Sequence, residues 1–195
     1  MHNKEDEATV DGVQRTVDVA NAAVRGNYTG PLVTAVTLVR SFFYFIYRGT
    51  PAHTSYPQIP LLKSTSSSPS ILLISSLAAL VPAPTRSLYG STKSASLLLY
   101  QSLAIEHPQI TFTAAIPATV EGNFRASAVD QGPVRETDPN THGLKREYVA
   151  RRCVEAVDAQ QKTVMLPYLY SRLGHLLYWF VPSVTEYFAR RKYNF

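Results

Sequence analysis

The feature that most constrains the fold is an apolar run, a helix-forming segment and a second apolar run, in that order. Residues 71–76, Ile-Leu-Leu-Ile-Ser-Ser, are bounded by turn residues and predict a buried strand. The pattern predicts a helix over 89–106 and a second strand over 110–116, which Pro117 ends. Strand, helix and strand in this order form a right-handed crossover. The sequence therefore predicts an α/β fold with a parallel sheet.

The rest of the chain extends this alternation. A helix is expected over 145–158 and a last short strand over 163–167, with a loop at 118–142. Residues 8–40 read as two helices of the core, interrupted at 27–31. The apolar residues of the first of these helices, spaced by three or four, are Val10, Val13, Val17, Ala20 and Val24. The apolar face expected for the helix over 89–106 comprises Ala95, Leu98, Leu99, Ser102, Leu103 and Ile105.

A candidate catalytic group lies at the start of the helix over 89–106. Tyr89 and Lys93 are four residues apart, so they share one helix face, and a nearby ammonium lowers the pKa of a phenol. Ser76 ends the preceding strand, thirteen residues before Tyr89, where its hydroxyl can bind a substrate carbonyl oxygen. Tyr-x-x-x-Lys alone often marks two surface residues of a helix. The strand end and the spacing make this combination more specific.

Residues 71–120 resemble the catalytic strand, the catalytic helix and the following strand of the short-chain dehydrogenase/reductase family. The resemblance implies a Rossmann-like, doubly wound parallel sheet. It also implies that Ser76 orients the substrate and that Tyr89 donates or accepts the proton. Lys93 would then lower the pKa of Tyr89 and contact the ribose of the cofactor, so Tyr89 and Lys93 both belong to the cofactor site.

The resemblance extends to residues on either side of this segment. The family uses an asparagine in a pattern like Asn-x-x-Gly, and Asn27 with Gly30 matches it. Asn27 is therefore the candidate for a fourth catalytic residue, and the alternative is an ordinary capping or turn asparagine. Pro117, Thr119 and Val120 correspond to the strand end that contacts the nicotinamide, although the glycine expected after the proline is an alanine here.

The closing residues, 148–195, are similar to the branch called dehydrogenase/reductase SDR family member seven. That similarity implies NADP(H), with NAD(H) as the alternative cofactor, and interconversion of a lipophilic ketone and alcohol. It also implies peripheral association with the membrane of the endoplasmic reticulum or of lipid droplets. The sequence leaves the oligomeric state, the reaction direction and the substrate open.

The sequence departs from the family in two further places. Its nine glycines include no cluster of three, so the glycine-rich turn that holds the pyrophosphate has no counterpart, and neither do the strands around it. Residues 41–60 read as an insertion. We therefore expect residues 1–195 to form one N-terminally truncated domain. The rival is a non-catalytic pseudoenzyme that contacts a membrane or a partner. An unrelated small helical membrane protein would require the Ser76, Tyr89 and Lys93 spacing to be an accident.

Charge is concentrated in the last quarter of the chain. The net charge is +5, and residues 145–195 hold nine Lys/Arg against four Asp/Glu. Residues 168–195 form an aromatic and basic helical segment, with a capping box predicted from Ser183 to Glu186. Its alternatives are an interfacial membrane anchor, packing over the substrate pocket or on a second subunit, and nucleic-acid binding, which no stacking motif supports.

Other function classes are disfavoured by composition. One cysteine excludes an internal disulfide, and the five histidines lack metal-ligand spacing, so no metal site is expected. The acidic, polar N-terminal residues resemble neither a signal peptide nor a transit peptide. No apolar stretch reaches the roughly 18 residues of a spanning helix.

Overall fold

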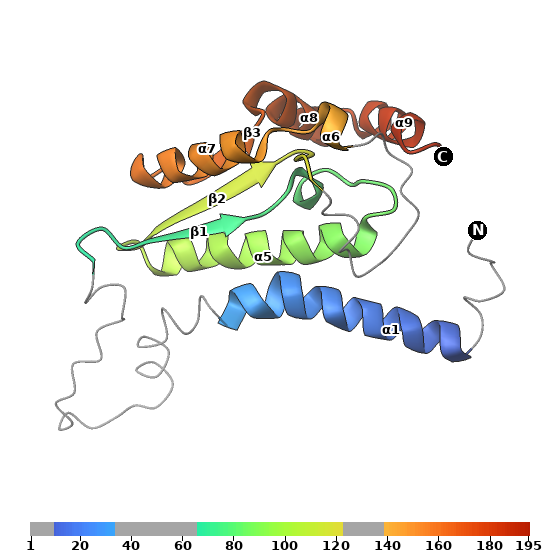
Figure 1. Ribbon diagram of the computed structural model, residues 1–195, viewed down its shortest axis with the longest axis horizontal. Coiled ribbons are helices and arrows are strands. Elements are labelled where there is room, and N and C mark those ends of the chain that lie inside the picture. The colour runs from blue at the N-terminus through green and yellow to red at the C-terminus, as the bar shows by residue number, and fades with distance from the viewer. Residues whose placement is uncertain (1–9, 34–65, 123–138) are drawn as a thin grey trace.

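The computed structural model describes residues 10–33, 66–122 and 139–195. They form an α/β fold around a three-stranded parallel sheet in the order β1 (Ser70–Ile74), β2 (Thr111–Pro117) and β3 (Thr163–Leu166). Figure 1 shows the three strands running in one direction between helical layers. This confirms the predicted parallel crossover. The expected insertion at residues 41–60 lies outside the described residues.

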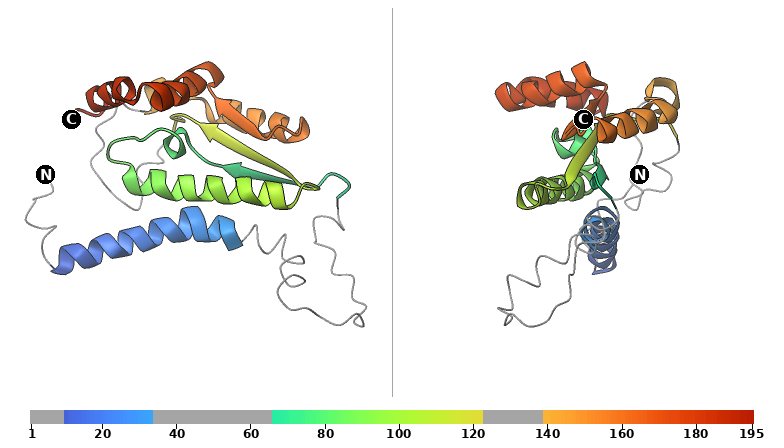
Figure 2. Two further views of the ribbon diagram at one scale, coloured as in Figure 1. Left: turned by 180° about the vertical axis from the view of Figure 1, so that it is seen from behind. Right: turned by 90° about the vertical axis from the view of Figure 1, so that its left-hand side faces the viewer.

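Helices cover both faces of this sheet. Helix α5 (Ser87–Glu106) packs on one face, and α7 (Arg146–Asp158) packs on the other. Helix α1 (Val10–Val24) lies alongside α5, whereas α8 (Tyr168–Phe180) and α9 (Pro182–Lys192) lie at the opposite side of the molecule (Figure 2). Both strand–helix–strand units therefore have the layered arrangement that the sequence predicts.

Strand β2 is the centre of the core because it is paired on both sides and covered on both faces. Six of its seven residues are buried, which matches an almost continuous apolar run. On the α5 face, Ile71, Leu73, Phe112 and Ile116 form one cluster, and the Tyr100 ring meets the Phe112 ring edge-on at 6.1 Å. On the α7 face a second cluster comprises Ala115, Cys153, Ala156, Val164 and Leu166.

The buried face of α5 differs from the expected one. Leu98 and Ile105 are exposed, and of the expected residues only Leu103 is fully buried. The buried side instead carries small and hydroxylated residues among its apolar ones, and these are Gly90, Thr92, Ser96, Leu97, Tyr100 and Leu103. Hydroxyls can be buried there because each donates to a backbone carbonyl, as Ser96 does to Thr92 at 3.0 Å. An apolar count alone therefore selected the wrong face.

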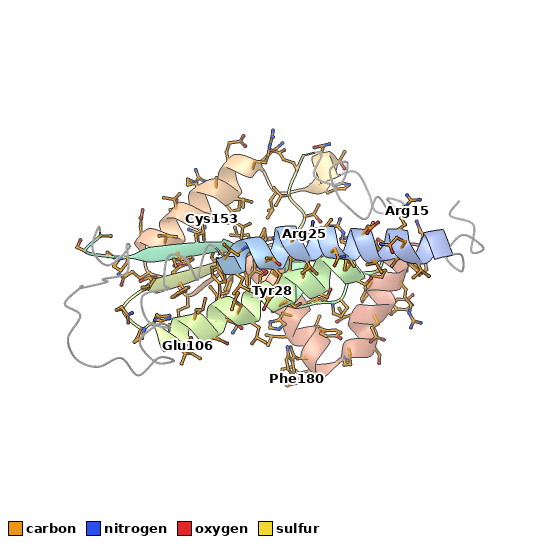
Figure 3. The ribbon with its side chains drawn as sticks, turned by 90° about the horizontal axis from the view of Figure 1, so that it is seen from below. Arg15, Arg25, Tyr28, Glu106, Cys153 and Phe180 are labelled. Carbon is orange, nitrogen blue, oxygen red and sulfur yellow. The ribbon has the colours of Figure 1, made fainter. Side chains whose placement is uncertain are left out.

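The N-terminal helical region also differs from the prediction. The helix does not stop at residues 27–31 but passes through a π-helical turn, η2 (Arg25–Thr29), and the turn ends with Gly30 N donating to Arg25 O. A wider turn relieves the clash that Pro31 would cause in a regular helix. The expected apolar face is largely exposed, at Val13, Val17 and Val24. In Figure 3 this helix lies along α5, and Tyr28 lies where it meets α5.

Helices α8 and α9 are the most exposed part of the described fold. Ser171 is the only fully buried residue of α8, and α9 has none. The predicted capping box is wrong, because α9 begins at Pro182 and its N-cap, Val181, offers no side-chain hydrogen bond. Among the described helices, none combines the length and the apolar character needed to cross a membrane.

Candidate active site

Two serines end β1 and begin the site. Ser75 is buried, and its backbone N–H donates to Ala115 O at 2.8 Å, so the strand pairing extends beyond Ile74. Ser76 then caps the short 3₁₀ helix η3 (Leu77–Ala79), and its Oγ accepts from the N–H of Ala78 at 3.2 Å. The cap fixes the Ser76 side chain at the carboxyl edge of the sheet, where open α/β folds bind ligands.

The turn that carries Ser76 is held against the first turns of α5. A Cβ on Gly90 would lie 2.9 Å from the carbonyl oxygen of Ala78, so only glycine permits this approach. Ser94 Oγ also donates to Ala79 O at 2.8 Å, which ties the same turn to the helix. Sequence reasoning did not assign a role to Gly90 or Ser94. Their role is to set the position of Ser76 relative to α5.

Tyr89 and Lys93 lie one turn apart on α5, as predicted. The Lys93 ammonium is 5.9 Å from the centre of the Tyr89 ring and donates to the carbonyl oxygen of Ile74 at 3.0 Å. Burial lowers the pKa of Lys93 because desolvation disfavours its charged form. The hydrogen bond to Ile74 anchors the ammonium at the end of β1, next to the serines.

The loop after β2 supplies the opposite wall. Ala118 N donates to Leu166 O at 2.7 Å, and Leu144 N donates to Thr119 O at 2.9 Å. Val120 and Leu144 also form an isolated parallel bridge. These backbone bonds fix the loop that contains the predicted residues Thr119 and Val120.

One cavity of about 540 Å³, which we call the Tyr89 cavity, brings most of the predicted residues together. Six of them line it at the carboxyl ends of β1 and β2, from two strand ends and one helix, and these are Ser76, Tyr89, Lys93, Pro117, Thr119 and Val120. The volume lies within the range of ligand sites, about 300–1,000 Å³. The cavity can therefore hold a small molecule in contact with a hydroxyl, a phenol and an ammonium.

Asn27 is not among the residues that line this cavity. It belongs to the π-helical turn, and its backbone carbonyl accepts a hydrogen bond from Ser96, one turn beyond Lys93 on α5. Tyr100 OH also donates to Pro31 O at 3.2 Å, so two side chains of α5 hold this turn in place. The catalytic role of Asn27 stays a prediction.

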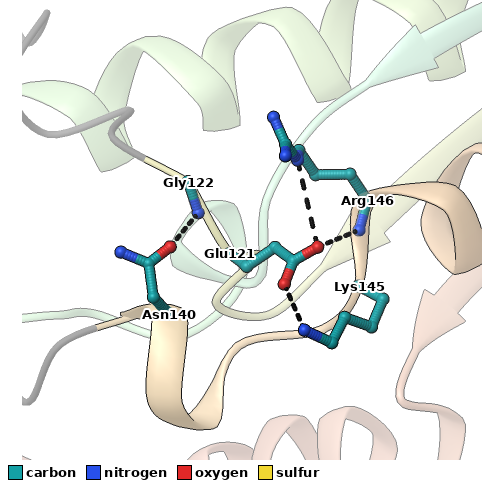
Figure 4. Close-up of polar contacts among 5 residues, drawn as sticks. All are labelled: Glu121, Gly122, Asn140, Lys145 and Arg146. Carbon is teal, nitrogen blue, oxygen red and sulfur yellow. Dashed lines mark hydrogen bonds and ion pairs between the residues drawn. The ribbon is translucent and has the colours of Figure 1, made fainter.

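An ion-pair cluster closes one edge of the cavity. Glu121 accepts from Lys145 Nζ at 2.7 Å and from the backbone N–H of Arg146 at 3.2 Å (Figure 4). The hydrogen bond from Lys145 is the largest cause that lowers the pKa of Glu121, and the bond from the Arg146 backbone lowers it further. The Lys145–Glu121 hydrogen bond also raises the pKa of Lys145. Gly122, at φ +116°, donates to Asn140 Oδ1 at 2.9 Å. The cluster therefore joins the loop after β2 to the start of α7.

The remaining wall comes from the C-terminal helices. Thr185, Phe188, Ala189 and Lys192 line the cavity, and their spacing of three, four and seven residues places them on one face of α9. Sequence analysis left packing over the pocket as one alternative for this segment but named none of these residues. The i, i+3, i+4, i+7 pattern was readable, although nothing in it indicated which surface α9 would cover. Among the described residues, no three His, Cys, Asp or Glu side chains gather to hold a metal ion.

Comparisons with known proteins bear on the fold. No protein-family model matches the chain, and no curated protein gives a significant match. Among solved structures, the chain is similar to a short-chain dehydrogenase from Sphingobium yanoikuyae in complex with NADPH. The TM-score is 0.52 with 20% identity, over 87% of this chain and 55% of that one. It also aligns with the bulky-bulky ketone specific alcohol dehydrogenase from Comamonas testosteroni, with TM-score 0.46, 21% identity, and coverage of 78% and 48%.

The first likeness shows the fold class. The three parallel strands and their helices correspond to part of a Rossmann-like fold, as the sequence predicted. The chain spans about half the length of the two solved proteins.

Proposed function

We propose that this chain carries the catalytic part of an NADP(H)-dependent oxidoreductase that interconverts a lipophilic ketone and its alcohol. The observation that carries the proposal is the convergence of Ser76, Tyr89 and Lys93 on one cavity at the carboxyl ends of two parallel strands. A similar fold occurs in a short-chain dehydrogenase in complex with NADPH, which supports the same cofactor here. Membership of the particular branch suggested by the C-terminal residues is part of the proposal.

The cavity suits the nicotinamide end of such a cofactor. Lys93 would bind a ribose hydroxyl, while Pro117, Thr119 and Val120 would contact the nicotinamide from the opposite wall. Bound NADPH would supply the hydride for reduction of the substrate carbonyl carbon. The glycine-rich turn that would hold the pyrophosphate is not encoded among these 195 residues, so this chain would hold only one end of the cofactor strongly.

The proton would pass through Tyr89. In the reductive direction its phenol donates a proton to the substrate oxygen as that oxygen gains negative charge. Ser76 Oγ already accepts from Ala78, so its own hydrogen remains available to donate to the same substrate oxygen. The Lys93 ammonium stabilises the phenolate that is left behind, because opposite charges at short range favour the ionised form.

Titration of the purified chain with NADPH, followed by ketone turnover, tests this proposal. Nicotinamide fluorescence should change on binding with a Kd below the millimolar range, and a lipophilic ketone should then be reduced. The matched variant Tyr89→Phe keeps the ring in the cavity and removes the hydroxyl group that carries the exchangeable proton. A chain that binds no NADPH, or that reduces ketones equally well with Phe at position 89, contradicts the proposal.

A second candidate is a non-catalytic protein that binds a membrane surface. It is favoured by the exposed aromatic side chains of α8, including Trp179, which is 73% exposed, and Phe180, which is 79% exposed. Figure 3 shows Phe180 at the outer edge of the helical layer. Arg172 and the basic last turn of α9 place positive charge on the same segment, which is the combination that binds anionic lipid headgroups. Membrane binding by itself is compatible with the oxidoreductase proposal, since Trp179 and Phe180 do not line the Tyr89 cavity.

A further inference from the structure

The Tyr89 cavity has an excess of positive charge. Four cationic side chains from three parts of the chain line it, and the only carboxylate among its lining residues is Glu121. The cations are Arg86, Lys93, Arg146 and Lys192. Glu121 bonds Lys145 and also forms an ion pair with Arg146 Nε at 3.9 Å, so it offsets part of this charge and leaves a net positive lining. Cavities lined by one sign of charge concentrate ligands of the opposite sign.

Arg86 and Thr185 mark one place within this region. Both line the Tyr89 cavity and also a neighbouring cavity of about 480 Å³ between α5 and α9, so they lie where the two meet. The Nε atom of Arg86 is buried and the residue as a whole is half-buried, so part of its side chain lies within the cavity wall. Thr185 Oγ1 is also buried and has no hydrogen-bond partner among the described residues. Of the four buried hydroxyls that lack a partner among the described residues, Thr185 Oγ1 is the one that lines both cavities, so a polar atom of a ligand there could pair with it.

The surroundings of this place are partly apolar, and Glu186 and Arg190 also line the smaller cavity. Val81 and Pro82 line both cavities, and Phe188 continues the apolar wall on the α9 side of the Tyr89 cavity. Lys192 lies on the same face of α9 as Thr185, two turns further along, which is about 10 Å by helix rise. A ligand with an apolar body and one anionic group would contact the guanidinium of Arg86, the hydroxyl of Thr185 and the apolar wall together.

We propose that Arg86 and Thr185 form an anion subsite, so that the substrate is an amphiphile with a phosphate or carboxylate group attached to its lipophilic part. The inference rests on the proposed oxidoreductase function and narrows its substrate class. The carbonyl would lie at Tyr89, and the anionic group would lie at the junction of the two cavities. Lys192, which also lines the Tyr89 cavity, adds to the positive potential there.

Calorimetric binding of four ten-carbon probes to the full chain tests the subsite without any need for turnover. The probes are decyl phosphate, decanoate, 1-decanol and decyltrimethylammonium. The two anions should bind about tenfold more tightly than 1-decanol, and the cation should bind most weakly. A larger gain for decyl phosphate than for decanoate identifies a phosphate, and the reverse order identifies a carboxylate. Equal affinity for decyl phosphate and 1-decanol would overturn the inference.

Variants assign the effect to the named residues. Arg86→Gln should weaken decyl phosphate about tenfold, and Thr185→Val should weaken it about threefold. The control Arg151→Gln removes an exposed cation of α7 that pairs with Glu155 and should change nothing. If circular dichroism shows that Arg86→Gln does not fold, Thr185→Val decides alone. Unchanged decyl phosphate binding in the folded variants would refute the subsite.

The cofactor is the other source of phosphate, and a separate titration distinguishes it. If Arg86→Gln weakens NADPH binding and leaves decyl phosphate unchanged, the guanidinium serves the cofactor and the inference is wrong. Anion binding without any ketone turnover would refute the oxidoreductase proposal while leaving the subsite in place. Turnover of neutral ketones with no preference for anionic probes would refute the anion subsite and leave the oxidoreductase proposal in place.

Discussion

The two walls of the Tyr89 cavity are built in different ways. The wall formed by α5 and the strand ends rests on a helix with six buried residues, a glycine contact that admits no side chain, and several side-chain bonds to backbone carbonyls. The wall formed by α9 rests on a helix with no buried residue. The residues proposed to carry the chemistry therefore lie on the wall that is tied to the core. The proposed contacts with the substrate body fall to the wall where substitutions disturb the core least.

The largest effect is expected from Tyr89→Phe, which tests whether the proton donor lies on the α5 wall. Removing the proton donor should lower kcat by about 10²–10⁴-fold while NADPH binding changes little, because the ring stays in place. Steady-state turnover together with a nicotinamide titration measures both quantities. A comparable loss from Phe188→Ala on the opposite wall would contradict the division of roles.

Gly90→Ala is expected to destabilise the contact between α5 and the turn that carries Ser76. The new methyl group would meet the Ala78 carbonyl at 2.9 Å, which should lower the free energy of unfolding by about 1–3 kcal/mol and displace Ser76. Urea denaturation measures the loss. Ser91→Ala, at the neighbouring exposed position of the same helix, is the matched control and should stay within about 0.5 kcal/mol of wild type. Equal stability of the two variants would show that the turn can move away.

Substitutions on the exposed helices α8 and α9 should change membrane binding more than they change the free energy of unfolding. The double change Trp179→Ala and Phe180→Ala should weaken sedimentation with vesicles containing anionic lipid by about tenfold or more, because large apolar side chains leave the interface. Leu98→Ala and Ile105→Ala on exposed positions of α5 serve as the control pair. Vesicle binding that ignores the α8 change, or that is equally strong with neutral lipid, would count against the membrane proposal.

The smallest effect is expected at the Glu121 ion-pair cluster, which joins the loop after β2 to the start of α7. Because the folded state lowers the pKa of Glu121, its pairing stabilises the fold above the carboxyl's unfolded pKa, and that stabilisation is lost as pH falls through the lower folded value. Glu121→Gln should therefore lower Tm by about 1–3 °C at pH 7. The difference from wild type should vanish in acid, below the folded pKa. A difference that persists there would mean that the carboxylate charge is not the cause.

Much of this architecture could be predicted from short-range patterns. Apolar runs bounded by turn residues located β1, β2 and β3, and the spacing of Ser76, Tyr89 and Lys93 grouped the side chains that line the cavity. Such patterns work because strand burial and helix periodicity are local properties of the sequence.

What could not be predicted depends on contacts between distant segments. The wide turn around Asn27 admits Pro31 and is held by Ser96 and Tyr100, nearly seventy residues further along the chain. The role of Gly90 follows from one carbonyl of another element. The stripe on α9 is regular in sequence, but its partner surface is assembled from β1, β2 and α5, so no local rule identifies it.

The bond from Lys93 to Ile74 bears on how such a site tolerates change over time. Its acceptor is a main-chain carbonyl, which every residue type provides, so drift at position 74 cannot remove it. The side chain of Ile74 is itself substantially exposed and free to be exchanged. A mutation must alter the path of the strand, or the lysine itself, before the ammonium loses its anchor. Many substitutions on the neighbouring surface could therefore accumulate while the Lys93 ammonium keeps its position.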